Sequence, residues 1–558
     1  MIAPSEFEST LRQFITGIVM ALPGIDSAEP PVVALESPRS RAHGDMACSS
    51  AMQLASRLRK PPVQIAQQIA AQIQALLPAS ALAGAIASVE VKPPGFINFF
   101  LSQEFLASVL QEVLKRGSDY GRIQYGQGKK AMVEFVSANP TGPLSVAHGR
   151  QAAVGDALAS ILDFAGYKVD REYYLNDEGT QIELLGSSLL VRAQQQLGRS
   201  AEIPENGYKG DYLIVAAKKW LEQNGEAIAD DPDAQKKAKA FIVKELIEVI
   251  RGELERFGVR FNRWYPQSSL DEKEYLKETL ELLKKRGDLF EQEGAWWLRS
   301  TAYGDDKDRV VIRSDGRLTY IAADIAYHRT KYERGYQRLV NLLGPDHHGY
   351  IVRLKASVQA MGFDASWLNV LIVQLCTLKR GSELIPMSTR EGKFTTLTEL
   401  MDEVGVDAAR FFFLLRKIDA HLEFDLELAK KHTLDNPVYY IQYAHARISR
   451  IAENAAQEKI SADQADPALL KSPEERLLLE LMRNFPNIIE LTARTLETYA
   501  VVAYLQELAA AFHKFYDAHR IIGSEPAVAA ARLQLCVGVK TVLGNGLRLL
   551  GVSAPEKM

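Results

Sequence analysis

Cysteine is scarce in this chain of 558 residues, which has only Cys48, Cys376 and Cys536 and no C-x-x-C pair. A disulfide framework and a cysteine-held zinc site are therefore excluded as organising features, and a reducing compartment fits best. The sequence also lacks a run of about 20 apolar residues, the length that crosses a membrane. Residues 14–25 have the length of a signal-peptide core, but Glu6 and Glu8 stand where such signals carry positive charge. We expect a soluble cytoplasmic protein with no membrane segment.

A strong excess of charge is missing as well. The 66 Lys and Arg nearly balance the 70 Asp and Glu, for a net charge of −4. This balance argues against a generally basic coat for nucleic acid and leaves a local basic face open. The 47% hydrophobic and 24% charged residues are ordinary globular proportions. We expect several packed domains and no long disordered region.

The hydrophobic periodicity divides the chain into three segments. Residues 1–115 mix helical patterns with strand-like runs, which predicts a small α+β domain. Residues 116–430 alternate strand and helix patterns, which predicts a parallel α/β sheet covered on both faces, and a charged helical stretch at 233–258 interrupts them as an insertion. Residues 431–558 carry almost no strand signal and predict an all-α bundle.

Residues 138–150, "ANPTGPLSVAHGR", are the strongest local signal. An apolar strand-like run, "AMVEFV", precedes this Gly/Pro loop and a helical pattern follows it, so the loop leads into a helix N-terminus that suits a phosphate. Attack on the α-phosphate of a nucleoside triphosphate builds charge on phosphate oxygens, which preorganised donors such as an imidazole stabilise. We therefore expect His148 to contact phosphate, the alternative being a plain helix-capping turn.

Two further stretches carry polar residues that suit chemistry. Residues 386–394, "PMSTREGKF", are a hydroxyl-rich basic loop that suits closure over a triphosphate, with a solvated turn as the alternative. The run Asp346, His347 and His348 has the look of a metal site. Neighbouring residues on a strand point to opposite faces and rarely ligate one ion together, so we predict no structural metal there.

Five motifs in order resemble those of the arginyl-tRNA synthetases, a family of class I aminoacyl-tRNA synthetases. They are "EFVSANPTGPLSVAHGR", "REYYLNDEGTQI", "GPDHHGYIVRLK", "PMSTREG" and "NPVYYIQYAHARI". The resemblance runs nearly end to end and implies an N-terminal tRNA-contacting α+β domain (1–115), a Rossmann-type catalytic domain (116–430) and a helical anticodon-binding domain (431–558). It implies ATP-dependent activation of L-arginine and transfer to the 3′ end of arginine tRNA.

The first signature of the family falls on residues 145–148, with Ser145 in place of the usual histidine and Ala147 in place of the usual glycine. Ser145 can donate one hydrogen bond but carries no charge. The second signature lacks its lysines, so we expect Lys129 or Lys130, with Arg390, to supply positive charge at the triphosphate; the alternative is a solvated lysine pair. The catalytic residues implied by the resemblance are His148, Ser145, Lys129, Lys130 and Arg390. The implied ATP-binding residues are Asn139, Pro140, Gly142, His148, Gly149, Asp346, His348, Met387, Ser388 and Thr389.

Selection of arginine needs a carboxylate that faces the guanidinium, because a two-pronged fork separates arginine from lysine. The resemblance assigns this work to Glu134, Ser137, Asn139, Tyr320 and Asp324. Tyr320 and Asp324 are four apart and share a helix face. We expect Asp324 to pair with the guanidinium, and Glu134 and Asn139 to lie nearer the α-amino end. The alternative for Glu134 is a salt bridge in the core.

Tyr439, Tyr443 and Arg447 recur at four-residue spacing in the last segment and suit stacking on anticodon bases, the alternative being ordinary core. We expect Mg²⁺ to arrive with ATP, held mainly by its phosphates, and neither a tightly bound cofactor nor a zinc ion. We also expect a monomer. Two other functions stay open: a nucleotidyl-transferring enzyme that acts on a small metabolite, and a catalytically silent relative that binds tRNA as a regulator.

Overall fold

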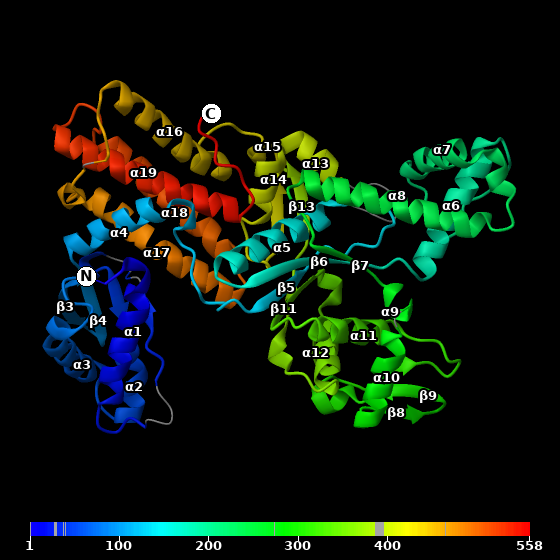
Figure 1. Ribbon diagram of the computed structural model, residues 1–558, viewed down its shortest axis with the longest axis horizontal. Helices are drawn as coiled ribbons and strands as arrows, with labels where there is room; N and C mark the ends of the chain where they lie inside the picture. The colour runs from blue at the N-terminus through cyan, green and yellow to red at the C-terminus, as the bar shows by residue number, and fades with distance from the viewer. Residues whose placement is uncertain are drawn as a thin grey trace.

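The computed structural model describes residues 2–26, 31–36, 38, 41–272, 274–385, 395–463 and 465–558. The N-terminal domain packs three helices around an antiparallel sheet of order β1-β2-β4-β3, which confirms the α+β prediction (Figure 1). Its elements are α1 (Pro4–Met20), β1 (Leu35–Glu36), β2 (Met46–Cys48), α2 (Ser50–Leu58), α3 (Pro62–Leu76), β3 (Ile86–Lys92) and β4 (Phe96–Leu101).

Helix α4 (Gln103–Arg116) follows this domain and packs on the C-terminal helices α17 (Pro473–Thr495) and α19 (Pro526–Leu549). Beyond its end, the Tyr120 hydroxyl donates to the Met482 carbonyl over 2.9 Å, and the Asn545 amide donates to the Gly117 carbonyl over 2.9 Å. The N-terminal domain is therefore joined through α4 to the helical bundle rather than to the central sheet (Figure 1).

The central sheet has five strands in the order β12-β11-β5-β6-β7, and all of their pairings are parallel. The carboxyl ends of parallel strands meet at one edge, and the loops that follow them gather there. The strands are β5 (Lys130–Glu134), β6 (Lys168–Leu175), β7 (Arg263–Pro266), β11 (Arg338–Leu343) and β12 (Leu368–Ile372).

Helices cover both faces of this sheet, as the alternating pattern predicts. Val133 and Val340 belong to the core that includes α5 (Val146–Phe164), whereas Met132 and Leu339 belong to the core of α10 (Tyr275–Arg286), α11 (Tyr320–Glu333) and α12 (Tyr350–Ala360). Neighbouring residues of each strand thus face opposite sides, as strand geometry requires.

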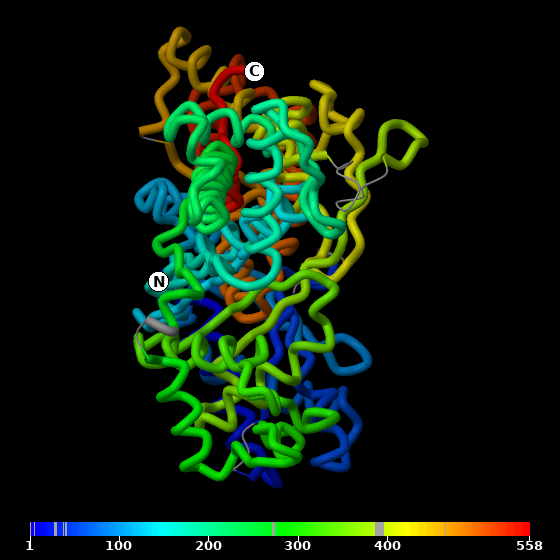
Figure 2. The backbone as a smooth tube through the Cα atoms, turned by 90° about the vertical axis from the view of Figure 1, so that its right-hand side faces the viewer, coloured from blue at the N-terminus to red at the C-terminus, as the bar shows by residue number. Residues whose placement is uncertain are grey.

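The insertion consists of α6 (Thr180–Gln196), α7 (Tyr212–Asn224) and α8 (Ala234–Arg256). It has an apolar core of its own, around Leu189, Trp220 and Ile242, and it projects away from the sheet (Figure 1) toward the viewer of Figure 2. The far end of α8 returns to the main core, where Leu254 is buried. The insertion is therefore rooted in the catalytic domain by one continuous helix.

Two small sheets complete the catalytic segment. The antiparallel sheet β10-β9-β8 lies beside α10 and α11, and the chain turns after β10 at Asp315–Gly316, with the Arg313 amide donating to the Arg317 carbonyl over 2.8 Å. The sheet β14-β13-β15 flanks α5, and its β13–β14 hairpin stands out from the side of the molecule in Figure 2. The elements are α9 (Ser269–Glu272), β8 (Leu289–Gln292), β9 (Ala295–Leu298), β10 (Arg309–Ile312), β13 (Cys376–Arg380), β14 (Glu383–Ile385), α13 (Leu397–Val404), α14 (Val406–Phe413), β15 (Leu422–Asp425) and α15 (Leu426–Ala429).

The C-terminal segment is a bundle of α16 (Pro437–Gln457), α17, α18 (Tyr499–Ala518) and α19, which confirms the all-α prediction. In the described part of the chain, α19 alone is long and apolar enough to cross a membrane, a property that the sequence analysis did not find. Half of its most apolar window is buried, and α19 packs against α4, α16, α17 and α18 as the core helix of a bundle does.

A buried arginine joins the bundle to the catalytic domain. Arg410 on α14 is fully buried and donates to Asp156 Oδ2 on α5 over 2.6 Å, to the Phe257 carbonyl over 2.9 Å and to the Leu550 carbonyl over 3.2 Å. Gly551 has a φ of +66°, and a Cβ there would lie 2.1 Å from the guanidinium. The end of the last helix is thereby fixed to α5.

Candidate active site

The loop predicted to bind phosphate begins in a strained turn at the carboxyl end of β5. Val136 has a φ of +66° and Ser137 a φ of +40°, and the Ser137 amide donates to the Phe135 carbonyl over 2.9 Å. Positive φ is costly for a β-branched residue and persists only where its surroundings hold it. Such strain is typical of functional loops.

Contacts from two neighbouring elements hold this loop in place. The Tyr173 hydroxyl of β6 donates to the Ala138 carbonyl over 2.8 Å, and the Tyr212 hydroxyl of the insertion donates to the Thr141 carbonyl. The Asn139 amide donates to Gln181 Oε1 over 2.7 Å. The insertion therefore helps to fix the loop as well as extending beyond it.

His148 lies in the first turn of α5 as a neutral donor. The Ser145 amide, at the N-cap, donates to His148 Nδ1 over 3.1 Å, and the Ser145 hydroxyl lies 3.2 Å from the same nitrogen. With Nδ1 as acceptor, the ring proton lies on Nε2. Burial lowers the pKa of His148 to about 4, which keeps the ring neutral. The turn therefore caps the helix, as the alternative interpretation predicts. It also leaves the Nε2–H of the imidazole available to donate.

Gly149 has a packing reason of its own, whereas the space beside Gly142 would admit a side-chain carbon. A Cβ on Gly149 would lie 2.7 Å from Leu397 and 3.1 Å from the ring of Phe413, so its missing side chain faces the helices α13 and α14. A Cβ on Gly142 would lie 3.6 Å from Tyr212. Gly149 therefore serves the close approach of helices to α5, and its α-carbon does not face open space beside His148.

Glu253, near the end of α8, links the loop to the segment after the second signature. Its Oε2 accepts from the Leu144 amide over 3.0 Å, and its Oε1 accepts from the Thr398 hydroxyl over 2.8 Å. Burial raises the pKa of Glu253, whereas these two hydrogen bonds lower it. The Leu397 amide also donates to the Leu144 carbonyl over 2.8 Å. The first loop and the start of α13 are therefore held as one unit.

The second signature itself lies outside the described residues: Met387, Ser388, Thr389 and Arg390 fall between Ile385 and Thr395, where the description resumes. The roles expected of them stay predictions. The segment that follows it lies beside the first loop, because Thr396 pairs with Ser145 through a β-bridge.

Lys129 and Lys130 do not lie at this site, which corrects the prediction that one of them reaches the triphosphate. Lys130 begins β5 and pairs in register with Lys168 at the start of β6, whereas the loop follows Glu134 at the other end. The five residues of β5, at about 3.3 Å each, separate the edge of the sheet that bears Lys130 from the edge that bears the loop. Both lysines are exposed, as the solvated-pair alternative held.

Asp346 and His348 follow β11 and so reach the same edge as the loop. Both are exposed, and Asp346 lies 3.4 Å from His347. A Cβ on Gly344 would lie 3.6 Å from Gln151 of α5, which places this turn against the helix of His148. In the described ranges, no three His, Cys, Asp or Glu side chains gather as a metal site.

Asp324 and Tyr320 lie one turn apart on α11, as their spacing predicts. The Tyr350 hydroxyl of α12 donates to Asp324 Oδ2, and Tyr320 is 72% exposed. Burial raises the pKa of Asp324 to about 6; Tyr350 opposes the shift, and the nearby charge of Glu134 adds to it. A guanidinium would relieve this cost by pairing with the carboxylate.

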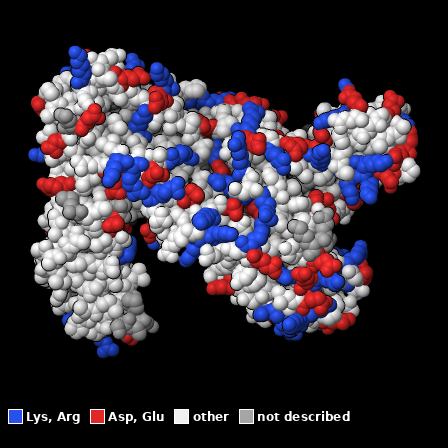
Figure 3. All heavy atoms as spheres, in the orientation of Figure 1, with Lys and Arg blue, Asp and Glu red and all other residues white. Residues whose placement is uncertain are grey.

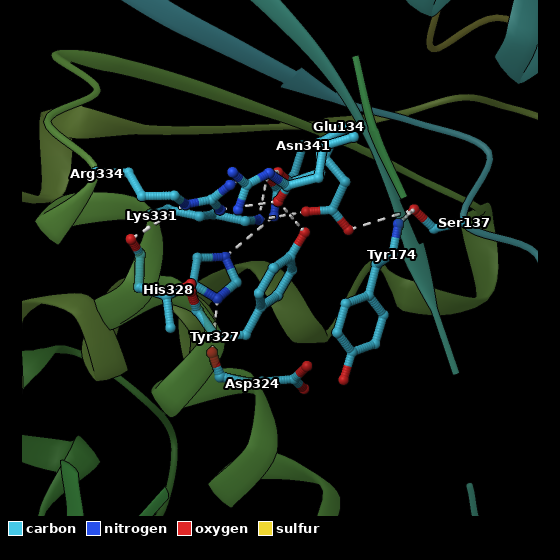
Figure 4. A network of polar contacts seen from close by, with 12 residues as sticks. Glu134, Ser137, Tyr174, Asp324, Tyr327, His328, Lys331, Arg334 and Asn341 are labelled. Carbon is cyan, nitrogen blue, oxygen red and sulfur yellow. Dashed lines mark hydrogen bonds and ion pairs between the residues drawn. The ribbon is translucent and has the colours of Figure 1, made fainter. Parts of the chain in front are cut away.

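Glu134 is engaged in a buried ion pair, as the core alternative for this residue held (Figure 4). Its Oε2 accepts from Lys331 Nζ of α11, and its Oε1 lies 3.4 Å from the Ser137 hydroxyl. Lys331 is fully buried and Glu134 is 7% exposed. The structure brings Glu134, Ser137 and Asp324 to one end of the sheet, and it adds Lys331.

Sequence reasoning missed Lys331, Tyr350 and Glu253. The signal for Lys331 was present, because it follows Asp324 by seven residues, two helical turns along the same face. Tyr350 and Glu253 come from distant elements, α12 and α8, and no local spacing in the sequence indicates that they reach the site.

On the bundle, the tyrosine and arginine side chains predicted to share one face of α16 stack on one another. Tyr439 and Tyr443 are stacked with centroids 5.9 Å apart, and the Arg447 guanidinium lies 4.7 Å from the centre of Tyr443 and 4.6 Å from that of Tyr516 on α18. All four side chains keep part of their surface exposed. Figure 3 shows Lys and Arg side chains gathered on the middle of the visible face of the molecule, above the hollow beside the N-terminal domain.

Comparisons with known proteins cover all three segments. Residues 5–101 match the arginyl tRNA synthetase N terminal domain, residues 109–417 the catalytic domain of class I (R) tRNA synthetases, and residues 441–558 the DALR anticodon binding domain. These matches leave no place for the small-metabolite enzyme considered above.

Curated relatives carry the name arginine–tRNA ligase. One from Desulforamulus reducens is 45% identical over 96% of this chain and 95% of its own length, and one from Syntrophotalea carbinolica is 44% identical over 98% and 99%. Among solved structures, Thermus thermophilus arginyl-tRNA synthetase has the same fold, with a TM-score of 0.78, 21% identity, and coverage of 99% of this chain and 100% of its own. The chain belongs to the arginyl-tRNA synthetase family.

Proposed function

We propose that the chain joins L-arginine to its tRNA in two steps at the carboxyl edge of the central sheet. The arginine carboxylate attacks the α-phosphorus of ATP and pyrophosphate leaves, which gives arginyl-adenylate. A terminal ribose hydroxyl of arginine tRNA then takes the arginyl group and AMP leaves. Catalysis is by positioning and by donors at the phosphates, with no protein nucleophile.

The observation that supports this proposal most is the neutral His148, whose Nε2 proton lies at the end of a pinned loop. The residue that replaces the usual histidine, Ser145, acts through His148: its backbone amide occupies Nδ1 and so directs the proton to Nε2. His148 donates to a phosphate oxygen, and Asp346 and His348 lie at the same edge for the remainder of the nucleotide. Asn139 and Pro140, in the same loop, contact the nucleotide as well.

Asp324 pairs with the guanidinium in this proposal, and Tyr320 lies one turn before it. Glu134 and Ser137 bind the arginine from the side of β5. Mg²⁺ enters with ATP, bound chiefly by phosphate oxygens. Tyr439, Tyr443 and Arg447 stack on anticodon bases. The chain acts as a monomer in the cytoplasm.

Aminoacylation of total tRNA with each radiolabelled amino acid tests the proposal. We expect only arginine to be incorporated, and we expect ATP–pyrophosphate exchange to require tRNA. Binding of tRNA without arginine-dependent exchange or aminoacylation would refute the proposal and favour the silent regulator. His148→Ala should lower kcat for adenylate formation by about 10²-fold or more, as loss of a preorganised donor does.

A further inference from the structure

Lys331 holds one carboxylate oxygen of Glu134 and leaves the other with unused capacity. Glu134 Oε2 takes the ammonium, whereas Oε1 has only the 3.4 Å contact with the Ser137 hydroxyl. An ionised carboxylate can accept about four hydrogen bonds, and buried polar atoms are normally satisfied. The unused acceptor lies at the end of β5, where the signature loop begins.

The ammonium of Lys331 is also the start of a hydrogen-bond chain that runs in one direction (Figure 4). It donates to Asn341 Oδ1 over 3.3 Å, which turns the Asn341 amide toward His328 Nε2 at 3.0 Å. His328 must then carry its proton on Nδ1, which lies 2.8 Å from the Asp324 carbonyl. Burial lowers the pKa of His328 to about 3, so the ring stays neutral and the direction of the chain is fixed.

This chain ties the two proposed arginine ligands together. Glu134 comes from β5, the linking residue Asn341 comes from β11, and His328 and Lys331 lie on α11 with Asp324. Lys331 has no freedom to turn away, since its ammonium also lies 4.0 Å from the centre of the Tyr327 ring. The position of Glu134 is thereby set relative to the helix that bears Asp324.

Among the described residues of this cluster, the carboxylates outnumber the lysine and arginine side chains. Glu134 and Asp324 share Lys331, with His347 also near Asp324, whereas the neighbouring Glu172 is paired with Arg334, whose Nη2 donates to it over 2.9 Å. A guanidinium would restore the balance. Ion pairs buried in this way rarely add stability compared with apolar side chains, so stability alone does not account for the lysine.

We propose that Lys331 is a positioning residue for arginine: its buried ammonium holds one oxygen of Glu134 and so keeps the other aimed at the substrate. The proposal rests on the proposed role of Glu134 as an arginine ligand. Lys331 itself does not touch the substrate.

The test measures KM for arginine, KM for ATP and kcat in aminoacylation by the full-length chain. Lys331→Met removes the charge at similar length. We expect it to raise KM for arginine about 10- to 100-fold, the range for a hydrogen bond to a charged group, with KM for ATP nearly unchanged. Arg329→Met is the matched control, because Arg329 lies on the same helix but pairs outward with Glu278 and Glu333. It should leave both KM values at the wild-type level.

A double-mutant cycle identifies the route of the effect. If Lys331 acts through Glu134, Lys331→Met should raise KM for arginine little further once Glu134→Gln is present. An equal cost in both backgrounds would overturn the proposal. If Glu134→Gln raises KM for arginine and Lys331→Met does not, the proposed role of Lys331 is refuted and that of Glu134 stands. If Glu134→Gln leaves KM for arginine unchanged, the proposed function of Glu134 itself fails.

The pH profile separates positioning from a structural role. Glu134 from β5, Tyr174 from β6, His347 from the turn before α12 and Tyr350 from α12 act on Asp324, and loss of Lys331 removes a charge that lowers the pKa of Asp324. Lys331→Met should therefore move the acid limb of kcat/KM for arginine to higher pH. Loss of activity with an unmoved limb would contradict the proposal.

Asn341→Asp provides a second variant in case Lys331→Met does not fold. It keeps the shape of the side chain and offers Lys331 a competing carboxylate, so KM for arginine should rise while KM for ATP stays near the wild-type value. Unchanged KM for arginine in a folded Asn341→Asp variant would count against the proposal.

Discussion

Replacement of Arg410 by methionine tests how the bundle is held to the catalytic domain. The substitution leaves Asp156 with its other partner, since Arg171 Nε donates to Asp156 Oδ1 over 2.8 Å. The carbonyls of Phe257 and Leu550 lose their donor. Each buried polar group left unpaired costs roughly 1–3 kcal/mol, and removal of one partner of a buried ion pair costs about 3–5 kcal/mol in all. We expect the free energy of unfolding to fall by about 3–5 kcal/mol.

Urea denaturation followed by tryptophan fluorescence measures this change. Every tryptophan of the chain lies between residues 220 and 367, so the signal reports on the catalytic domain and its insertion. Far-UV circular dichroism adds the helical bundle, and a wider gap between the two transitions would show that the domains unfold separately. Arg199→Met, which removes an exposed ion pair with Asp230, is the control. A loss no greater in Arg410→Met than in this control would refute the reasoning.

Four other outcomes follow from the active site and the bundle. KM for arginine should rise as the pH falls through about 6, where Asp324 gains a proton; a flat KM across this range would contradict the assignment. Because the folded pKa of Asp324 lies above its ordinary 3.8, the ionised carboxyl destabilises the free chain as the pH rises through this window, so Asp324→Asn should raise the thermal midpoint at neutral pH while it weakens arginine binding. Glu253→Ala should raise KM for ATP several-fold, whereas Glu253→Gln, which can still accept from Leu144 and donate to Thr398, should do so much less. Arg447→Ala should raise KM for tRNA by a factor that corresponds to about 1–3 kcal/mol, measured in aminoacylation, and leave thermal unfolding nearly unchanged.

Much of the architecture could be predicted because local pattern and topology agree. Strand–helix alternation in residues 116–430 indicates parallel strands, and parallel strands bring the ends of β5 and β11 to one edge. That topology alone also decides against Lys129 and Lys130, which stand at the opposite end of β5. The prediction for these lysines considered their nearness to the loop along the chain and not the length of the strand between.

The polar contacts of the site are less predictable, because they depend on the meeting of distant elements. Ser145 reads as a weakened catalytic position in the sequence, yet its backbone amide, which any residue except proline would supply, fixes the tautomer of His148. The partner of Glu134 is 197 residues away along the chain. Such pairings become visible only when α11 is placed across the sheet from the loop.

The docking of α4 has a consequence for how the chain can be divided. Leu110 of α4 fills the space left by Gly538, where a Cβ would lie 2.5 Å from it. Phe105, Leu106, Val109 and Val113 are also buried. A truncation before residue 117 would therefore strip an apolar wall from α17 and α19, and the shortened chain should aggregate. The first hundred residues form a distinct segment in the sequence. In the folded chain, however, the helix that follows them packs with the C-terminal helices as one unit.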